Sequence, residues 1–294
     1  MNPLPPAFQA VDATHVRLRG RKLVYFGGCD YFRLAGHAEM IEAVREGARR
    51  FGVNVAASRV TTGNHPLYEQ LERALVNFFR TQAALLVANG YLANLAVAQG
   101  IAGDISHALV DDRAHVGLLD AAEFLNCPVI RFRHRDARDL GVRMKRAGTG
   151  ARILVLTDGL FAHDGTVAPL REYLRVLPRS AVILVDDAHG AGALGLHGRG
   201  TVEETGVPDR RIIQTITFSK AFGAHGGAIL CPRRVRRRII ARSRLFAGHT
   251  PPPLPLVFAA LRSLRILRSA PGLRRRLRGN TRFLKEALRR AGFE

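Results

Sequence analysis

Short apolar runs alternate along the chain with longer segments of helical periodicity. Residues 182–185 and 212–218 are continuous runs rich in Val and Ile, which is typical of parallel strands that are covered on both faces. Residues 39–51 instead carry apolar side chains at helical spacing and stop at Gly52. The same patterns predict strands at 22–26, 84–88, 108–111, 129–132, 153–156 and 226–230, and helices at 67–79, 92–101, 116–124, 136–148, 170–177 and over most of the chain after residue 232.

This order of elements predicts the class of fold. Strands that alternate with helices at such spacing form a doubly wound α/β fold with a mainly parallel sheet. A chain of 294 residues is long enough for one large α/β domain and part of another. Residues 1–20 show neither pattern, so we expect an irregular arm there.

Polar side chains follow the two most apolar predicted strands. Asp186, Asp187 and His189 come directly after residues 182–185, and Ser219 and Lys220 come after residues 212–218. In open α/β sheets, ligands bind in the crevice beyond the carboxyl ends of the strands. The sequence therefore predicts that a carboxylate, an imidazole and an amine face one crevice.

These three groups match the needs of pyridoxal phosphate (PLP). The cofactor requires a lysine for a Schiff base and a carboxylate that keeps its pyridine nitrogen protonated. Lys220 and Asp186 can supply them. Only four of the 45 basic residues are lysine, so a lysine is unusual at this position. Arginine could not replace it, because its guanidinium stays protonated, whereas a desolvated lysine can reach a pKa of about 7 to 8.

Two further strand exits carry candidate residues. Gly90 and Tyr91 lie between a predicted strand and a predicted helix, where backbone amides and the helix dipole favour an anion such as phosphate. A plain turn is the alternative there. His115 follows the strand at 108–111, and it is either a core histidine or part of the site. We assign no role to His65, His163 or His197.

The chain is strongly basic, with a net charge of +21 and a pI near 11.4. Many of the arginines lie between apolar residues at helical spacing in segments 233–240 and 273–277. They are expected to form solvated helix faces, although an anionic partner such as a coenzyme A ester or RNA is the alternative. We expect nucleic acid not to be the partner.

Several classes of protein are excluded or made less probable by the sequence. No apolar run reaches the ~18 residues that a membrane span requires, and the first residues lack the pattern of a signal peptide. We therefore expect a cytoplasmic protein. The three cysteines are far apart and form no C-x-x-C pair, which argues against both a disulfide framework and a structural zinc site.

Two motifs compete with the PLP interpretation. Residues 190–195 match G-x-G-x-x-G after a strand, but the glycine-rich residues 196–200 cannot open the helix that a dinucleotide site needs. Residues 186–189 (D-D-A-H) match the acidic box of an RNA helicase. The chain has no G-K-[ST] phosphate loop, so that interpretation also fails.

Three longer motifs resemble one family. They are V-D-D-A-H-G-A-G with G-R-G (185–200), T-F-S-K-A-F-G (217–223) and D-G-L-F-A-H-D-G (158–165). From about Lys22 onward the chain resembles the α-oxoamine synthases of fold-type I PLP enzymes, which include 8-amino-7-oxononanoate synthase and 2-amino-3-ketobutyrate coenzyme A ligase. The resemblance implies a mainly parallel seven-stranded sheet sandwiched by helices.

The resemblance also implies roles for individual residues. Lys220 would form the Schiff base and later transfer protons, and Asp186 would pair with the pyridine nitrogen. His189 would bond the phenolic oxygen of the cofactor, and His115 would stack on its ring. The phosphate would be bound by Gly90, Tyr91 and Thr217.

The implied activity is that of a PLP-dependent acyltransferase. A small amino acid would condense with an acyl-coenzyme A thioester and lose carbon dioxide, as in biotin biosynthesis, and the enzyme would be a homodimer. An aminotransferase or lyase of the same fold, or an inactive remnant that binds PLP or an anionic partner, remain alternatives.

The chain departs from the family pattern in several places. The family usually has serine where Ala162 stands, histidine where Tyr68 stands, and asparagine where Cys29 stands; its motif G-S-G-G-S-R is replaced at residues 54–59, and its S/T-rich stretch at residues 246–252. We expect an arm at 1–34, a PLP-binding domain at 35–235, and at 236–294 a helical linker with the start of a truncated C-terminal domain.

Overall fold

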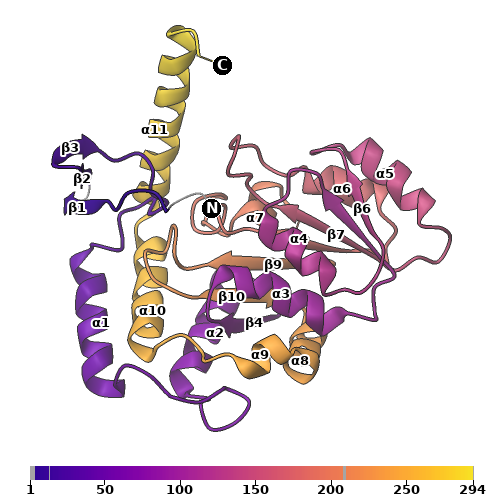
Figure 1. Cartoon of the computed structure of the whole chain (residues 1–294), viewed down its shortest axis with the longest axis horizontal. Coiled ribbons are helices and arrows are strands. Elements are labelled where there is room, and N and C mark those ends of the chain that lie inside the picture. Colours follow the sequence, from indigo (N-terminus) through magenta and orange to yellow (C-terminus); the bar gives the residue numbers. More distant parts are fainter. Residues whose placement is uncertain (1–3, 13, 208–209, 294) are drawn as a thin grey trace.

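The computed structural model describes residues 4–12, 14–207 and 210–293. Within them lies a seven-stranded sheet of order β4-β10-β9-β8-β7-β5-β6 (Figure 1). Its strands are β4 (Ala83–Val87), β5 (His107–Asp111), β6 (Val129–Phe132), β7 (Ile153–Asp158), β8 (Val182–Asp186), β9 (Ile212–Thr217) and β10 (Gly227–Cys231). Only β10 runs antiparallel to its neighbours among these strands. The predicted mainly parallel sheet is confirmed.

Helices cover both faces of this sheet. Alternate residues of each strand point to opposite faces, so Leu85 and Val87 pack with α3 (Gly90–Ile101), α4 (Val116–Glu123), α8 (Arg233–Arg242) and α9 (Arg244–Gly248). On the other face, Ala84 and Leu86 pack with α1 (Ala38–Phe51), α2 (Pro66–Phe79) and α10 (Leu254–Ser269). The same face carries α5 (Ala137–Arg146) and α6 (Leu170–Val176) over β5, β7 and β8. The chain is therefore a three-layered α/β/α structure.

The glycine-rich segment after β8 is a series of turns. Residues 188–198 form no helix, and α7 (Thr201–Glu204) begins only after them. Gly192, Gly195, Gly198 and Gly200 all have positive φ, a backbone conformation that favours glycine. No helix begins at these glycines, which confirms the prediction from the sequence. The interpretation as a dinucleotide site is therefore excluded.

The prediction of an irregular arm over residues 1–20 was wrong. The structure has an antiparallel sheet of β1 (Gln9–Asp12), β2 (His15–Leu18) and β3 (Arg21–Val24) there. Arg19 and Gly20 join β2 to β3 with φ of 48° and 79°, the positive values that a two-residue hairpin turn requires. The predicted strand at 22–26 corresponds to β3. β1 and β2 were missed because they are short and mostly polar, so they show no apolar run.

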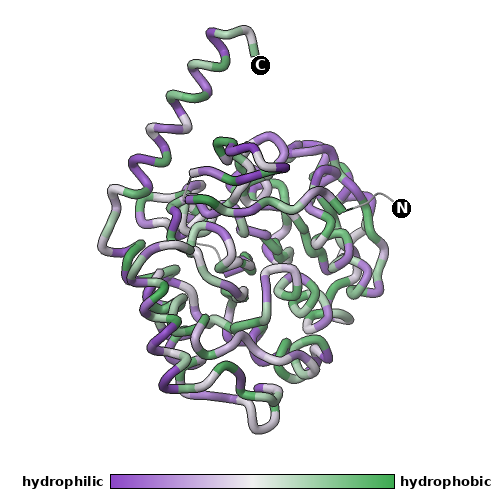
Figure 2. The backbone as a smooth tube through the Cα atoms, turned by 60° about the vertical axis from the view of Figure 1, so that its left-hand side comes forward, coloured by the Kyte–Doolittle hydropathy of each residue, from purple (hydrophilic) through white to green (hydrophobic). Residues whose placement is uncertain are grey.

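The last helix, α11 (Pro271–Arg290), extends away from the rest of the chain (Figure 1 and Figure 2). Apolar and polar residues alternate along it in Figure 2. Its first turns are held by Arg274, whose Nη1 donates to the Leu267 carbonyl at 2.8 Å, and by Arg278, which pairs with Glu204 at 2.8 Å. Among the described helices, none has the length and apolar character to cross a membrane.

Candidate active site

The exits of β8 and β9 bring Lys220 and His189 into contact. The strands are parallel neighbours whose register pairs Asp186 with Thr215, so the residues that follow each strand begin at the same edge of the sheet. Lys220 Nζ lies 2.6 Å from His189 Nε2, and both side chains are partly buried. The predicted amine and imidazole therefore lie side by side at this edge of the sheet.

The Asp186 carboxylate is held in place by hydrogen bonds from helix α3 and from the turn after β8. Its Oδ2 accepts a hydrogen bond from the Asn94 side-chain amide at 2.6 Å, and its Oδ1 accepts one from the Ala188 amide at 3.1 Å. Thr215 Oγ1 in turn donates to Asn94 Oδ1 at 2.6 Å. Since Asn94 is fully buried on α3, this network fixes the direction in which the carboxylate points.

Burial changes the protonation of the amine and the imidazole. Burial lowers the pKa of Lys220, while the Asp186 carboxylate acts in the opposite direction. Burial, with the nearby Lys220 and His115, lowers the pKa of His189 to about 4. His189 is therefore neutral near pH 7, and its Nε2 can accept a hydrogen bond from the lysine.

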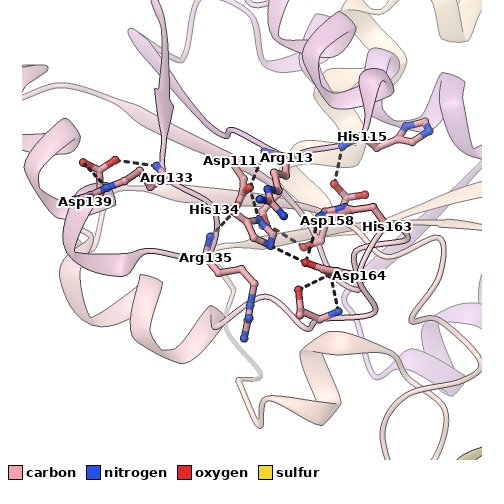
Figure 3. Close-up of polar contacts among 12 residues, drawn as sticks. Asp111, Arg113, His115, Arg133, His134, Arg135, Asp139, Asp158, His163 and Asp164 are labelled. Carbon is pink, nitrogen blue, oxygen red and sulfur yellow. Dashed lines mark hydrogen bonds and ion pairs between the residues drawn. The ribbon is translucent and has the colours of Figure 1, made fainter. Parts of the chain in front are cut away.

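His115 stands at the rim of the crevice. It caps the first turn of α4, and its Nδ1 accepts a hydrogen bond from the Gly117 amide at 3.1 Å. Its own amide donates to Asp158 Oδ2 at 2.8 Å, and its ring points away from that carboxylate (Figure 3). Burial and the neighbouring Asp186 raise the pKa of Asp158 to about 7.

Gly90 and Thr217 meet at the N-terminus of α3. A Cβ atom on Gly90 would lie 2.9 Å from Thr217 Cβ, so only glycine allows this approach. Asn89 caps the helix by accepting from the Leu92 amide at 2.9 Å. The first-turn amides of α3 and their dipole therefore lie beside a buried threonine, an arrangement that suits an anion. Tyr91 is 46% exposed, and its hydroxyl donates to Asp120 at 2.7 Å.

Sequence reasoning missed three residues of this site, Tyr31, Asn94 and Asp158. The Tyr31 hydroxyl lies 2.5 Å from His189 Nδ1, on the side opposite Lys220. Asp158 is the last residue of β7. The sequence analysis included it in the motif at 158–165 but assigned it no role of its own. Asn94 gave no signal, because it is a single polar residue within an apolar helix.

Asp187 has a structural role. It is fully buried and accepts hydrogen bonds from the Thr201 amide, the Thr201 hydroxyl and the Gln214 side chain at 2.8, 2.7 and 2.6 Å. These bonds close the glycine-rich turns after β8. Of the two adjacent acids, only Asp186 faces the crevice of Lys220.

The donors in the crevice fit PLP. They comprise a buried amine, a carboxylate oriented by Asn94, neutral imidazole at His189, and a helix N-terminus without a Cβ at Gly90. Each corresponds to one need of the cofactor: Schiff-base formation, pairing with the pyridine nitrogen, a bond to the phenolic oxygen and phosphate binding.

Comparison with known proteins agrees with this chemistry. The profile of the family described as "Aminotransferase class I and II" matches residues 21–294. An 8-amino-7-oxononanoate synthase of Pelobacter propionicus is 36% identical over 97% of this chain and 74% of its own length. That of Trichlorobacter lovleyi is 34% identical over 98% of this chain and 75% of its own length.

Solved structures are similar over nearly the whole chain. Serine palmitoyltransferase of Sphingomonas wittichii is 31% identical, with a TM-score of 0.92, over 97% of this chain and 72% of its own. A structure of serine palmitoyltransferase with PLP is 29% identical, with a TM-score of 0.92, over 98% of this chain and 73% of its own.

Fold and site together define a fold-type I transferase whose cofactor is PLP. The chain belongs to the aminotransferase class I and II family and, within it, to the α-oxoamine synthases.

Proposed function

We propose that the protein condenses a small amino acid with an acyl-coenzyme A thioester, with loss of carbon dioxide, in the manner of 8-amino-7-oxononanoate synthase. The observation that carries this proposal is the contact of Lys220 with His189 next to an Asp186 held by Asn94. The relatives most similar in sequence support the choice of reaction, because they bear that name.

In this proposal the chain's own groups have distinct tasks. Lys220 holds the cofactor and moves the proton at the Cα atom of the amino acid, which its lowered pKa favours. Asp186 would keep a proton on the pyridine nitrogen of the bound cofactor, and Asn94 holds this carboxylate in its orientation. When bound, the cofactor supplies an electron sink for negative charge at the substrate Cα.

The remaining predicted residues position the ligands. His115 covers the ring from the rim, and His189 bonds the phenolic oxygen as a neutral imidazole. Gly90, Tyr91 and Thr217 bind the phosphate at the start of α3. The basic surface of the chain attracts the phosphates of coenzyme A.

The proposal extends to the organisation of the protein. We propose an arm at 1–34, a PLP-binding domain at 35–235, and at 236–294 a helical linker with the start of a C-terminal domain. We also propose a cytoplasmic homodimer that serves biotin synthesis. Sedimentation of the purified holoenzyme tests the dimer, and complementation of a biotin auxotroph tests the pathway.

A first experiment tests cofactor binding. Wild type mixed with PLP should show the visible absorption band of a lysine Schiff base, and Lys220→Ala should lose it. Lys145→Ala is the matched control, because this lysine is exposed on α5, and it should keep the band. A band that survives in Lys220→Ala would overturn the assignment of Lys220.

A second experiment tests the reaction. The holoenzyme is incubated with alanine, glycine or serine and a panel of acyl-coenzyme A esters, and release of free thiol is measured. Thiol release that requires both substrates supports the proposed condensation. Conversion of the amino acid to its oxo acid without thiol release would instead indicate an aminotransferase.

A further inference from the structure

Two histidines and two aspartates gather at the same edge of the sheet, at the exits of β5, β6 and β7. His134 follows β6, Asp111 ends β5, and His163 and Asp164 lie in the loop after β7. Figure 3 shows His134 between Asp111 and Asp164, and the rings of His134 and His163 lie close together, with centroids 5.4 Å apart. The proposed reaction uses none of these four side chains.

Asp111 holds the His134 ring in place. The carboxylate is fully buried and accepts from the amides of Arg113 and Arg135 at 3.0 Å each, and it lies 2.9 Å from His134 Nδ1. With Nδ1 directed at this carboxylate, Nε2 is the ring nitrogen that faces Asp164 and can serve as a metal ligand. A carboxylate behind a histidine in this way is the usual second layer of a metal site.

The free faces of both imidazoles converge on one oxygen. His134 Nε2 and His163 Nε2 each lie 3.2 Å from Asp164 Oδ2. The other oxygen of Asp164 is already engaged by the amide and hydroxyl of Thr166 at 2.9 and 2.8 Å. Asp164 Oδ2, His134 Nε2 and His163 Nε2 therefore lie close enough together to bind one ion.

The spacing of these atoms fits a transition metal. Ligand atoms bound to zinc at about 2.0–2.1 Å in a tetrahedron lie about 3.3 Å from one another. The two nitrogen–oxygen distances of 3.2 Å match this edge, and the three ligand atoms all lie within 4.8 Å of one another.

We propose that His134 Nε2, His163 Nε2 and Asp164 Oδ2 form a binding site for a divalent transition metal of the zinc class. Imidazole and carboxylate ligands select this class over magnesium and calcium, which prefer oxygen alone. The side chains of His163 and Asp164 are 41% and 28% exposed, which lets an ion enter and leaves a position for water. The site needs no cysteine, so the cysteine patterns of structural zinc do not find it.

An ion here would fasten the loop after β7 to the ends of β5 and β6. That loop follows Asp158, which holds the His115 amide at 2.8 Å. By restraining this loop, the metal would stabilise the position of Asp158 and, through it, of His115. This inference does not depend on the substrates of the proposed reaction.

The test uses tag-free holoenzyme that has been treated with a chelator and filtered to remove excess PLP. Cobalt(II) is titrated in, and its visible d–d bands report both stoichiometry and coordination; the thermal midpoint is then measured with and without zinc. We expect one equivalent per chain and a higher midpoint with zinc. His163→Gln should lose both effects, since His163 is the exposed ligand and its replacement leaves the buried bond of Asp111 intact.

His197→Gln is the matched control, because His197 is an exposed histidine of a different turn, and it should bind like wild type. Asp164→Asn is a second variant that should also lose the cobalt bands. The proposal is overturned if wild type takes up no stoichiometric cobalt, in which case the cluster is a hydrogen-bonded network alone. Equal binding by wild type and His163→Gln would also overturn it.

Discussion

Lys220 and His189 stand 2.6 Å apart at the exits of two neighbouring parallel strands. Their contact brings together two side chains that the sequence predicted to lie at the same edge of the sheet. Because burial lowers the pKa of both groups, the lysine can lose its proton and the imidazole can accept a bond. The contact therefore favours a neutral imidazole and an amine that loses its proton more easily. These protonation states affect the stability of the fold as well as cofactor binding.

His189 should make stability depend on pH in the acid range. Its pKa is about 4 in the folded chain against 6.5 for an ordinary histidine, so the unfolded chain binds more protons between these values. Stability then rises with pH over this window and is lost as pH falls from 6.5 toward 4. After allowance for solvent screening, the loss should be about 1–2 kcal/mol.

The measurement is urea unfolding of apoprotein at several pH values, for wild type and His189→Asn. Asparagine does not titrate in this range, so the stability of wild type relative to the variant should decline below pH 6.5. A constant difference between the two proteins from pH 7 to pH 4 would contradict the assignment.

Asp158 should have the opposite dependence. Burial and Asp186 raise its pKa to about 7 from 3.8, so the folded chain binds more protons between these values. The contribution of Asp158 is therefore most favourable below pH 3.8 and is lost as pH rises through 7.

Asp158→Asn keeps an oxygen for the His115 amide but removes the charge. We expect this variant to gain about 1–3 kcal/mol relative to wild type as pH rises from 4 to 7. Urea unfolding over that range checks it. Glu123→Gln, which makes the same change from carboxylate to amide at an exposed position of α4, is the control and should show no such gain. A relative stability of Asp158→Asn that falls with pH would show the sign to be wrong.

Asn94 should be necessary for the orientation of Asp186. Asn94→Ala leaves a buried carboxylate and the Thr215 hydroxyl without their 2.6 Å partner, and unsatisfied buried groups cost about 1–3 kcal/mol each. We expect lower stability and weaker PLP retention, measured by unfolding and by the absorption band during dialysis. Asn77→Ala, an exposed change on α2, should alter neither.

A purely structural role for Asn94 would give a different result. The variant would then lose stability while holding PLP as wild type does at temperatures where both are folded. Loss of the cofactor under those conditions is the outcome that identifies Asn94 as a positioning residue.

The sequence predicts those parts of the site that depend on strands alone. Buried strands are visible as apolar runs, and parallel strands place their exits at one edge, so Asp186, His189 and Lys220 could be grouped before the structure was known. Asn94 and Tyr31 could not, because their roles arise from packing between elements. Tyr31 contacts His189 across 158 residues of sequence, and no local pattern encodes that distance.

The N-terminal hairpin shows a second limit. Residues 9–24 form strands that are largely exposed, and strands without a buried face do not show the alternation on which the prediction depends. The strand at 22–26 was predicted, but β1 and β2 were not. The turn at Arg19 and Gly20 gains meaning only when the flanking residues are known to pair.

Gly227 should be as important for the phosphate site as Gly90. A Cβ atom on Gly227 would lie 2.5 Å from the Asn89 carbonyl carbon and 2.7 Å from the Gly90 amide nitrogen. These are backbone atoms of the turn that opens α3, so they cannot move without displacing the helix N-terminus. Gly227→Ala should therefore cost about 1–3 kcal/mol in stability, as overpacking does, and raise the Kd for PLP.

Gly279 provides the matched control for this change. It lies within α11 with open space around the position of a Cβ, so Gly279→Ala should raise stability by up to about 1 kcal/mol through helix propensity. Thermal unfolding and a PLP titration of both variants decide the matter. If Gly227→Ala bound PLP as tightly as Gly279→Ala, the N-terminus of α3 would not be the phosphate site, because a displaced turn would have left the cofactor unaffected.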